Sequence, residues 1–488
     1  MATIKELPLP SYEQMGDLVA ASRAIALGIK ELAAGSAPGV TNPVTWKELK
    51  EFIDLGLGPV VTPIGSVIPV YKASSVTASM GVHTGITAVT VAMDVFLAAI
   101  GEVSNAVYEF KHDGTSWHLE EHAVNPTNYG ITVTGTPADG DTFTVTVVAA
   151  VNNFVVVDTL TDGKLSSGDT AAIKFKDPFK KNGIILHAVD VDYYGICFDE
   201  PEALYCSDSA LPAGTYYFSK GSYDSAYASE NFYQFTATAE IPANAQVVLE
   251  WGYQRQITEG SIKIYADGNS RSPLATYAIS AGNSGTYLGD ANASTRSGDI
   301  NHIQVARYGY NRYSQSFIRQ NLNSAAAKGN YYAPASKFDR KPAVADTLDG
   351  YMKGFDPGFL DIVEEVIVET CKNTITDCTS SEASAGNAYD ETVDKFFLPS
   401  RAEMFGGREN ASEKNTPFAY YKANSDLSTA GTGEDKNRIK LQGSTARVYW
   451  LRSPYAGGAG NPRSVNTSGT VGYGSAGSGN GWASACVI

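Results

Sequence analysis

The chain has 488 residues, of which 43% are hydrophobic and 18% charged, and it contains 28 tyrosines and 47 glycines. This length predicts about two to four domains, and the glycine and aromatic content favours a β-rich chain with many turns. The formal net charge of -15 argues against nucleic acid or an anionic membrane as the partner.

The cysteines and the N-terminal residues help to predict the cellular compartment. The odd number and the spacings of the five cysteines fit neither a disulfide framework nor a zinc motif. The opening run MATIKELPLPSYEQ has no apolar core and no cleavage pattern, so no signal peptide is predicted. No apolar run is long enough to cross a bilayer. We therefore expect a protein made in a cytoplasm, without membrane insertion.

Residues 1–58 are predicted to form a short helical segment for attachment or oligomerisation. Apolar residues recur at helical spacing from 11 to 36, where Ser11 can cap the start and Gly35 the end. Thr45-Trp46-Lys47-Glu48 has the pattern of a capping box that would open a second helix. A docked N-terminal helix with no role in assembly explains the same pattern.

Residues 71–152 alternate apolar and polar side chains in short runs, separated by turns such as Asp113-Gly114 and Asp139-Gly140. Short strands at regular spacing predict a small all-β sandwich, which we interpret as an Ig-like module. The module precedes a larger domain or is inserted into it. Residues 59–70 are a candidate first strand of that larger domain.

Residues 153–488 are assigned to this larger, C-terminal domain. Its expected strands lie at 182–190, 211–218, 232–235, 246–251 and 261–265. Helical signals appear from Ser314 to Lys328, ahead of Gly329, and from Asp356 to Cys371, where apolar residues form a helical stripe. Few helices on a large mixed sheet indicate an α+β fold.

Several features have the residue types of a chemical site, but each has a simpler explanation. The run Gly472–Gly477 matches G-x-G-x-x-G, yet too few residues follow it for the helix that this motif needs. The other candidates are favoured as solvated groups: His118 with His122, Glu364 with Glu365, and the acidic loop of Asp426, Glu434 and Asp435. We therefore expect no catalytic residue, no metal and no cofactor.

Three arginines lie in blocks that also contain aromatic residues: Arg312, Arg319 and Arg452. Such arginines stabilise loop-rich cores by donating to carbonyls and carboxylates, or they belong to a binding site. We favour the structural role.

The last stretch, residues 447–488, has apolar ends and a middle made almost wholly of Gly, Ser, Asn, Ala and Tyr. The middle cannot bury enough apolar surface to fold alone, whereas the ends look like short buried strands. We therefore expect a rigid sheet to display the middle. Small polar residues and tyrosine are also typical of adaptable binding loops.

The middle of this stretch also lacks certain residue types. From Tyr455 to Gly481 there is no Trp, Met, Lys, Glu or Gln, and a codon that ends in C or T encodes none of these residues. The pattern fits randomised AAC-type codons. An ordinary Gly/Ser-rich tail is the alternative explanation.

Several runs of the sequence resemble those of a known protein family. They are SQSFIRQNLNS, GFDPGFL and DKFFLPSRAEMFGG, and in the last stretch YWLRSPYA, VNTSG and ACVI. The chain resembles the C-type-lectin-fold variable proteins of diversity-generating retroelements, found among gut bacteriophage tail and receptor-binding proteins. The resemblance covers roughly residues 50–70 and 155–488. The run YGITVTGTPADGDTFTVTVVA resembles β modules of phage tail proteins.

In that family, template-directed mutagenesis at adenines rewrites chosen codons near the 3′ end of the gene. The resemblance implies a fixed scaffold at Tyr449–Pro454, Ala459, Val465, Gly469, Ala476 and Ala485–Ile488. It implies variable, ligand-binding positions at Gly457, Gly458, Gly460, Asn461, Ser464, Thr470, Gly472, Tyr473, Gly474, Ser475, Gly477, Ser478 and Asn480. Tyr473 and Arg463, the large side chains of the segment, would then carry most of the binding energy. Trp482 and Ser484 depart from the family's small apolar residue and proline, so the rim of the site is expected to differ.

The resemblance implies a receptor-binding protein of a phage tail tip or fibre that displays a hypervariable lectin-like surface to the host cell. Expected partners are a host surface protein or glycan, other tail proteins and further copies of the chain, with a trimer favoured. The expected location is the virion. A bacterial surface adhesin or another retroelement-diversified binding protein is the alternative. An enzyme of the formylglycine-generating type is less expected, because that chemistry needs a reactive cysteine pair.

Overall fold

The computed structural model describes residues 67–101, 103–157, 173–175, 185–189, 195–199, 205–206, 209–219, 232–249, 261–282, 284–290, 311–335, 339–372, 389–409, 413, 417–427, 434–456 and 460–487. In these ranges the fold is α+β and mostly β, as the sequence predicted, and the longest helix has 8 residues. The predicted helical segment at 1–58 lies outside them. None of their helices is both long and apolar enough to span a bilayer.

Residues 73–149 enclose one hydrophobic cluster, here called the module core. Two sheets contribute to it, with the strands β1 (Val67–Met80), β7 (Thr142–Val157), β3 (Ala106–His112), β4 (Trp117–Leu119) and β5 (His122–Val124) in one and β2 (Ile86–Val91) and β6 (Ile131–Gly135) in the other. Along β7, Phe143, Val145 and Val147 are buried while the threonines between them are half-buried. This alternation makes the unit a small sandwich. Helix α3 (Met93–Ile100), which the sequence did not indicate, adds Phe96 and Leu97 to the same core.

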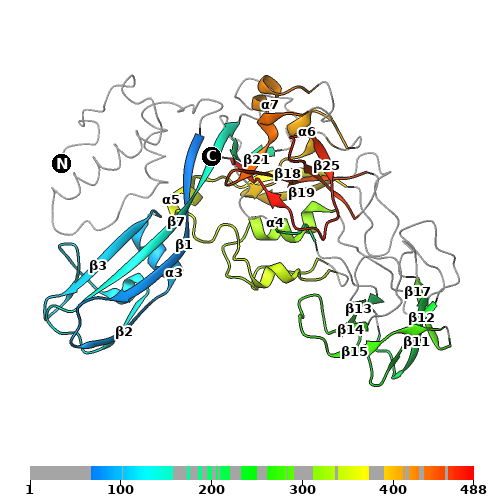
Figure 1. Ribbon diagram of the computed structural model, residues 1–488, viewed down its shortest axis with the longest axis horizontal. Helices are drawn as coiled ribbons and strands as arrows, with labels where there is room; N and C mark the ends of the chain where they lie inside the picture. The colour runs from blue at the N-terminus through cyan, green and yellow to red at the C-terminus, as the bar shows by residue number, and fades with distance from the viewer. Residues whose placement is uncertain are drawn as a thin grey trace.

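Strand β7 is 16 residues long and joins this sandwich to the C-terminal part of the chain. Its first half pairs with β3, and its last residues pair with β9 (Ile185–Ala188). Strand β9 pairs in turn with β27 (Ala485–Val487), next to β20 (Phe396–Phe397). Strand β1 pairs with β7 along almost its whole length. The two units therefore share one continuous ribbon, which Figure 1 shows between them.

Lys72 on β1 fixes the joint between the two units. Its side chain is buried, and Nζ donates to the carbonyl oxygen of Tyr351 at 2.6 Å. The same ammonium group lies 4.9 Å from the Tyr351 ring centroid and 5.1 Å from that of Phe355, at cation–π distance. The backbone N–H of Ala73 also donates to Gly354 at 2.7 Å. These contacts restrict rotation of one unit against the other.

A second cluster, the insert core, lies within residues 211–288. One of its sheets has the order β10 (Tyr205–Cys206), β13 (Gln246–Leu249), β14 (Ser261–Tyr265) and β15 (Ala275–Ala278), and the other β16 (Ser280–Ala281), β12 (Phe232–Ala237), β11 (Gly214–Ser219) and β17 (Thr286–Asp290). The range 153–488, expected as one domain, therefore contains two separate cores. Figure 1 shows this insert on the opposite side of the main unit from the module.

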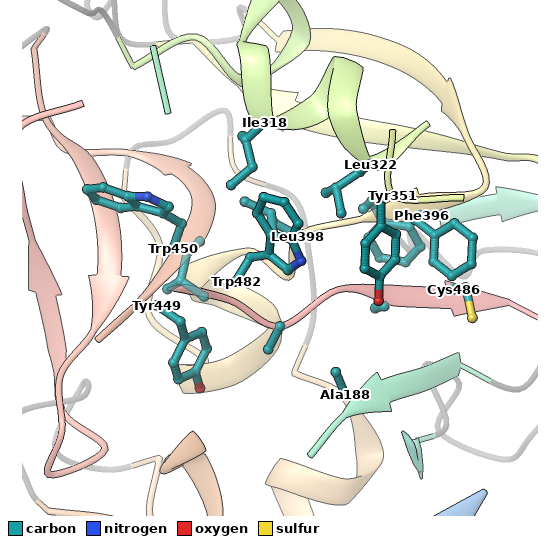
Figure 2. Close-up of a cluster of buried hydrophobic side chains, with 14 of the residues drawn as sticks. Ala188, Ile318, Leu322, Tyr351, Phe396, Leu398, Tyr449, Trp450, Trp482 and Cys486 are labelled. Atoms are coloured by element: carbon teal, nitrogen blue, oxygen red, sulfur yellow. The ribbon is translucent and has the colours of Figure 1, made fainter. Parts of the chain in front are cut away.

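The main core combines residues far apart in sequence, and its centre is aromatic. Tyr351 contacts Phe355, Phe396 and Trp482 edge-on at centroid distances from 5.0 to 5.8 Å. Figure 2 shows Tyr351, Phe396 and Trp482 gathered around the last strands, with Trp450 on the neighbouring strand. Such rings bury large areas and prefer edge-on geometry, so they fix how the last strands lie.

The structure confirms the expected strands between 182 and 265 over their described parts, but it shortens both expected helices. In the first region η4 (Tyr313–Gln315) precedes α4 (Phe317–Leu322), and the helix stops at Asn323 rather than Lys328. The Asn323 side chain donates to the carbonyl oxygen of Phe396 and accepts from the amides of Lys395 and Phe396. These bonds tie the chain to β20, so the helix cannot continue.

The expected helix from Asp356 to Cys371 is wrong in its second half. Helix α5 (Pro357–Ile362), capped by Asp356, is followed by the strand β18 (Val366–Cys371). This strand pairs with β19 (Tyr389–Asp394) on one side and β8 (Ile173–Phe175) on the other. Val366 continues the helical stripe, but Val366 and Val368 also alternate as in a strand, and β-branched residues favour the strand.

Asp141 organises the loops at one end of the module. Its buried carboxylate accepts hydrogen bonds from the amides of Thr84, Gly85, Ile86 and Ala138 at 2.6 to 3.1 Å. These bonds, with that of Ala138 the strongest, lower the pKa of Asp141 from 3.8 to about 2.

Because this pKa is lower in the folded state than in the unfolded chain, Asp141 stabilises the module above pH 3.8 and loses that effect as the pH falls through about 2. We expect amide hydrogen exchange at residues 81–86 to rise between pH 4 and pH 2, after correction for the intrinsic rate. Asp141→Asn should raise it already at neutral pH, whereas Asp139→Asn, at the exposed turn, should not. Equal protection in both variants would contradict this role.

Candidate functional site

The last stretch leaves the main core after Pro454 and returns to it at Gly481, and the residues between them are here called the excursion. Strand β23 (Tyr449–Pro454) pairs antiparallel with β24 (Pro462–Val465), which pairs with β25 (Val471–Tyr473). Strand β23 also pairs in parallel with β26 (Gly481–Trp482), so that Tyr449 lies beside Gly481 and Trp450 beside Trp482. The two ends of the stretch are therefore neighbours, and the residues between them leave the core and return to it.

Burial separates the positions expected to be fixed from those expected to vary. The described fixed positions are all buried, namely Tyr449–Pro454, Val465, Gly469, Ala476 and Ala485–Val487. The described variable positions are half-buried or exposed with one exception, and they are Gly460, Asn461, Arg463, Thr470, Gly472, Tyr473, Gly474, Ser475, Gly477, Ser478 and Asn480. Gly457, Gly458, Ala459 and Ile488 lie outside the described residues. These half-buried and exposed variable positions are here called the patch.

The exception is Ser464, which was expected to contact the ligand. It lies on the central strand β24 between Trp450 and Gly472, and its relative exposure is 1%. The sequence pattern could not show this, because a small polar residue fits either face of a sheet. Trp482 and Ser484 are also buried, and the Ser484 hydroxyl donates to that of Tyr351 at 3.0 Å. Both belong to the interior rather than to the rim.

Three glycines of the stretch differ in how much room a side chain would have. Gly469 has φ of 80°, and a Cβ there would lie 2.0 Å from the carbonyl oxygen of Asp435. A Cβ on Gly472 would meet the side chain of Asn466 at 2.5 Å, and one on Gly474 would lie 3.2 Å from the Trp450 ring. Only the first obstacle is backbone, so Gly469 is the least replaceable of the three.

The large side chains of the patch form one stack. Arg463 and Tyr473 are cross-strand partners on β24 and β25. The ring of Tyr473, which is 56% exposed, lies 4.1 Å from that of Tyr455 at an angle of 8°. The guanidinium carbon of Arg463 lies 4.5 Å from the centroid of the same Tyr455 ring. Tyr473 is thus displayed, whereas Arg463 supports the stack.

Glu409 binds this arginine from outside the last stretch. Its carboxylate accepts from Nε and Nη2 of Arg463 at 2.6 and 2.9 Å, from Arg401 at 2.8 Å and from the amide of Ala456 at 2.7 Å. The Arg463 side chain is only 13% exposed. Sequence reasoning missed Glu409, although a lone arginine in a segment without carboxylates implies a partner elsewhere. We therefore assign Arg463 to positioning rather than to ligand contact.

A second layer of buried polar groups lies beneath Glu409. Its backbone amide and the hydroxyl of Ser453 both donate to the carboxylate of Glu413. Burial raises the pKa of Glu413 above its ordinary value, against the opposing effect of these bonds. The side chains beneath the patch are therefore held in place by hydrogen bonds to one another.

Arg452 is paired deep in the core. It is fully buried, and its two terminal nitrogens donate to both oxygens of Glu403 at 2.5 and 2.6 Å. Glu403 also completes the capping box with Ser400 at the start of α6 (Arg401–Phe405). Arg312 and Arg319 form comparable pairs with Asp390 and Asp394. The structural role expected for all three arginines is confirmed.

The remaining chemical candidates are not brought together. Gly472–Gly477 spans the end of β25 and a turn, with no helix after it. His118 pairs with Asp113 at 2.9 Å, and Asp435 caps η7 (Lys436–Arg438). Across the part of the chain that the structure describes, no three His, Cys, Asp or Glu side chains are placed to hold a metal ion. Cys371 is buried, which raises the pKa of its thiol well above the usual value.

Comparison with known proteins returned one family. Residues 291–488 match a family model described as a domain of unknown function (DUF6273). This range includes the last stretch and both halves of the Arg452–Glu403 pair. No curated protein and no solved structure matches the chain.

The buried ion pair generates a prediction about stability. Replacement of Arg452 by Met leaves Glu403 as a buried carboxylate without its cation, which costs about 3–5 kcal/mol in comparable cases. We expect Arg452→Met to lower the free energy of unfolding of the main unit by this amount in urea denaturation. Lys422→Met, at an exposed position on α7 (Ala419–Asn424), serves as the matched control and should change it by less than about 0.5 kcal/mol. Equal effects of the two changes would contradict the assignment.

The glycine geometry generates a second prediction. Gly469→Ala requires a left-handed backbone and a clash with a carbonyl oxygen, so we expect a loss of about 1–3 kcal/mol. Gly472→Ala requires only that Asn466 change rotamer, so the loss should stay below about 1 kcal/mol. Thermal unfolding of both variants gives the comparison, and a greater loss for Gly472→Ala would refute it.

Proposed function

We propose that the chain is a receptor-binding protein of a phage tail tip or fibre, whose C-terminal unit has a C-type-lectin-like fold and displays a hypervariable surface to the host cell. The observation that carries this proposal is the separation of burial along residues 449–487. Side chains at the patch can change without altering the core, which a diversified binding protein requires. The absence of Trp, Met, Lys, Glu and Gln from 455 to 481 supports the same proposal.

The framework around the patch supports display. Strand β7 runs from the module into the part of the sheet that contains β9 and β27, and the Lys72 contacts hold the two units together. A surface held in a fixed orientation loses less entropy on binding than one carried on a free linker. Because the described patch carries few large side chains, affinity per site would be modest, and several copies on one virion would supply avidity.

The proposal predicts that binding and stability can be separated. A variant with Thr470→Asn, Tyr473→Asp and Ser478→Tyr should bind host cells at least about tenfold less well, while its melting temperature stays within about 2 °C. The matched control changes three exposed positions of the module, Val107→Ala, Glu121→Gln and His122→Asn, and should bind as the parent does. Flow cytometry with labelled protein measures binding, and calorimetry measures stability. Equal binding by both variants, or a collapse of stability in the first, would count against the proposal.

The genomic origin of the diversity has its own test. Sequencing around the gene should reveal a reverse transcriptase and a near-identical non-coding copy of the 3′ end that differs only at adenines. Labelling of the C-terminus on purified virions should place it at the tail. A label found on the bacterial surface instead would favour the adhesin.

A further inference from the structure

Tyr473 is the largest apolar group that the patch offers to solvent. Among the described residues from 434 to 487, only Leu441 and Tyr473 are large hydrophobic side chains with substantial exposure, at 37% and 56%. Tyr473 belongs to the patch, whereas Leu441 lies on β21 (Lys440–Gln442), outside the excursion. Within the described part of the patch, Tyr473 is therefore the most exposed large apolar group that a ligand can meet, and it is an aromatic ring.

This ring is held before any ligand arrives. It stacks nearly parallel on Tyr455, whose own ring contacts Arg463, and Arg463 is held by two hydrogen bonds to Glu409. A stacked ring has little rotational freedom left to lose, so it can bind at low entropic cost. The stack thus forms a flat, fixed platform with one face toward solvent.

The charge nearest the platform is paired rather than displayed. Arg463 is the only charged residue from Tyr455 to Gly481, and its guanidinium is paired with Glu409, which also pairs with Arg401. The whole chain carries a net charge of -15, which repels anionic ligands at long range. An acidic sugar or an acidic peptide therefore gains little from this surface.

The residues next to Tyr473 along the chain are small. Gly472 and Gly474 flank Tyr473 along the chain, so no bulky side chain adjoins it there. Ser475, Ser478 and Asn480 follow, half-buried or exposed, with hydroxyl and amide groups that both donate and accept hydrogen bonds. An exposed aromatic ring, on a patch that also carries small hydroxyl and amide groups, suits a ligand that is apolar on one face and hydroxylated at its edges.

We propose that the Tyr473 face binds a neutral hexopyranose ring of a host surface polysaccharide. The C–H groups on one face of such a ring carry partial positive charge and stack on the negative face of an aromatic ring, while its hydroxyls bond to the neighbouring serines and asparagine. This assignment rests on the proposed function and names its ligand class. A protein ligand fits less well, because stable protein interfaces need about 800 Å² per partner with several large anchors at the centre.

The test compares three substitutions at one exposed position. Tyr473→Phe keeps the aromatic face, Tyr473→Leu keeps apolar bulk without that face, and Tyr473→Ala removes both. The probes are immobilised neutral and acidic oligosaccharides, together with host cells before and after mild periodate oxidation. We expect binding to neutral sugars and to untreated cells, retention within about threefold in Tyr473→Phe, and a loss of at least about tenfold in the other two variants. Circular dichroism checks that all of them fold.

Other outcomes separate this inference from the proposed function. Cell binding that survives periodate but is lost after protease treatment of the cells overturns the sugar assignment and leaves the receptor-binding role intact. Preferential binding to acidic oligosaccharides, weakened by salt, also overturns it. Equal loss in Tyr473→Phe and Tyr473→Ala refutes stacking as the mode of binding. Absence of binding to any host surface contradicts the proposed function and this inference together.

Discussion

The parallel pairing of β23 with β26 is the constraint on which the rest of the structure depends. It places Trp450 beside Trp482 in an aromatic core, so both ends of the last stretch are fixed as neighbours. The segment between them is too rich in glycine and serine to make a core of its own, and it can only leave and return. A composition that would leave an isolated peptide unfolded therefore becomes an ordered, displayed surface.

The buried ion pairs around the last stretch contribute more to the positions of its side chains than to the net free energy of folding. A buried ion pair such as Arg452 with Glu403 gains little net free energy, because desolvation offsets most of the attraction, but it is costly to break. Glu409 repeats the arrangement nearer the surface by holding Arg463 and Arg401 together. The two carboxylates hold the side chains beneath the patch, so we expect substitutions at the exposed positions to leave the core unchanged.

Local sequence patterns predicted most strands and the displayed stretch. The features that they did not predict depend on contacts between residues far apart in the sequence. The alternation along β7 is visible in the sequence, because one face of the strand packs on a core. The valines of β18 fit two periodicities, and only their pairing with β19 selects the strand. The insert core was missed, since nothing in its composition marks a boundary. Glu409 and the burial of Ser464 depend on contacts between segments distant in sequence, which one sequence does not reveal.

The central claim is that burial divides the last stretch into positions that must be kept and positions that can change. A saturation library over residues 447–487, displayed on cells and sorted for resistance to protease, measures this directly. We expect intolerance at Tyr449–Pro454, Ser464, Gly469 and the last strands, and broad tolerance at Asn461, Thr470, Tyr473, Gly477 and Ser478. Uniform intolerance along the stretch, or loss of folding at the exposed positions as severe as at the buried ones, would contradict it.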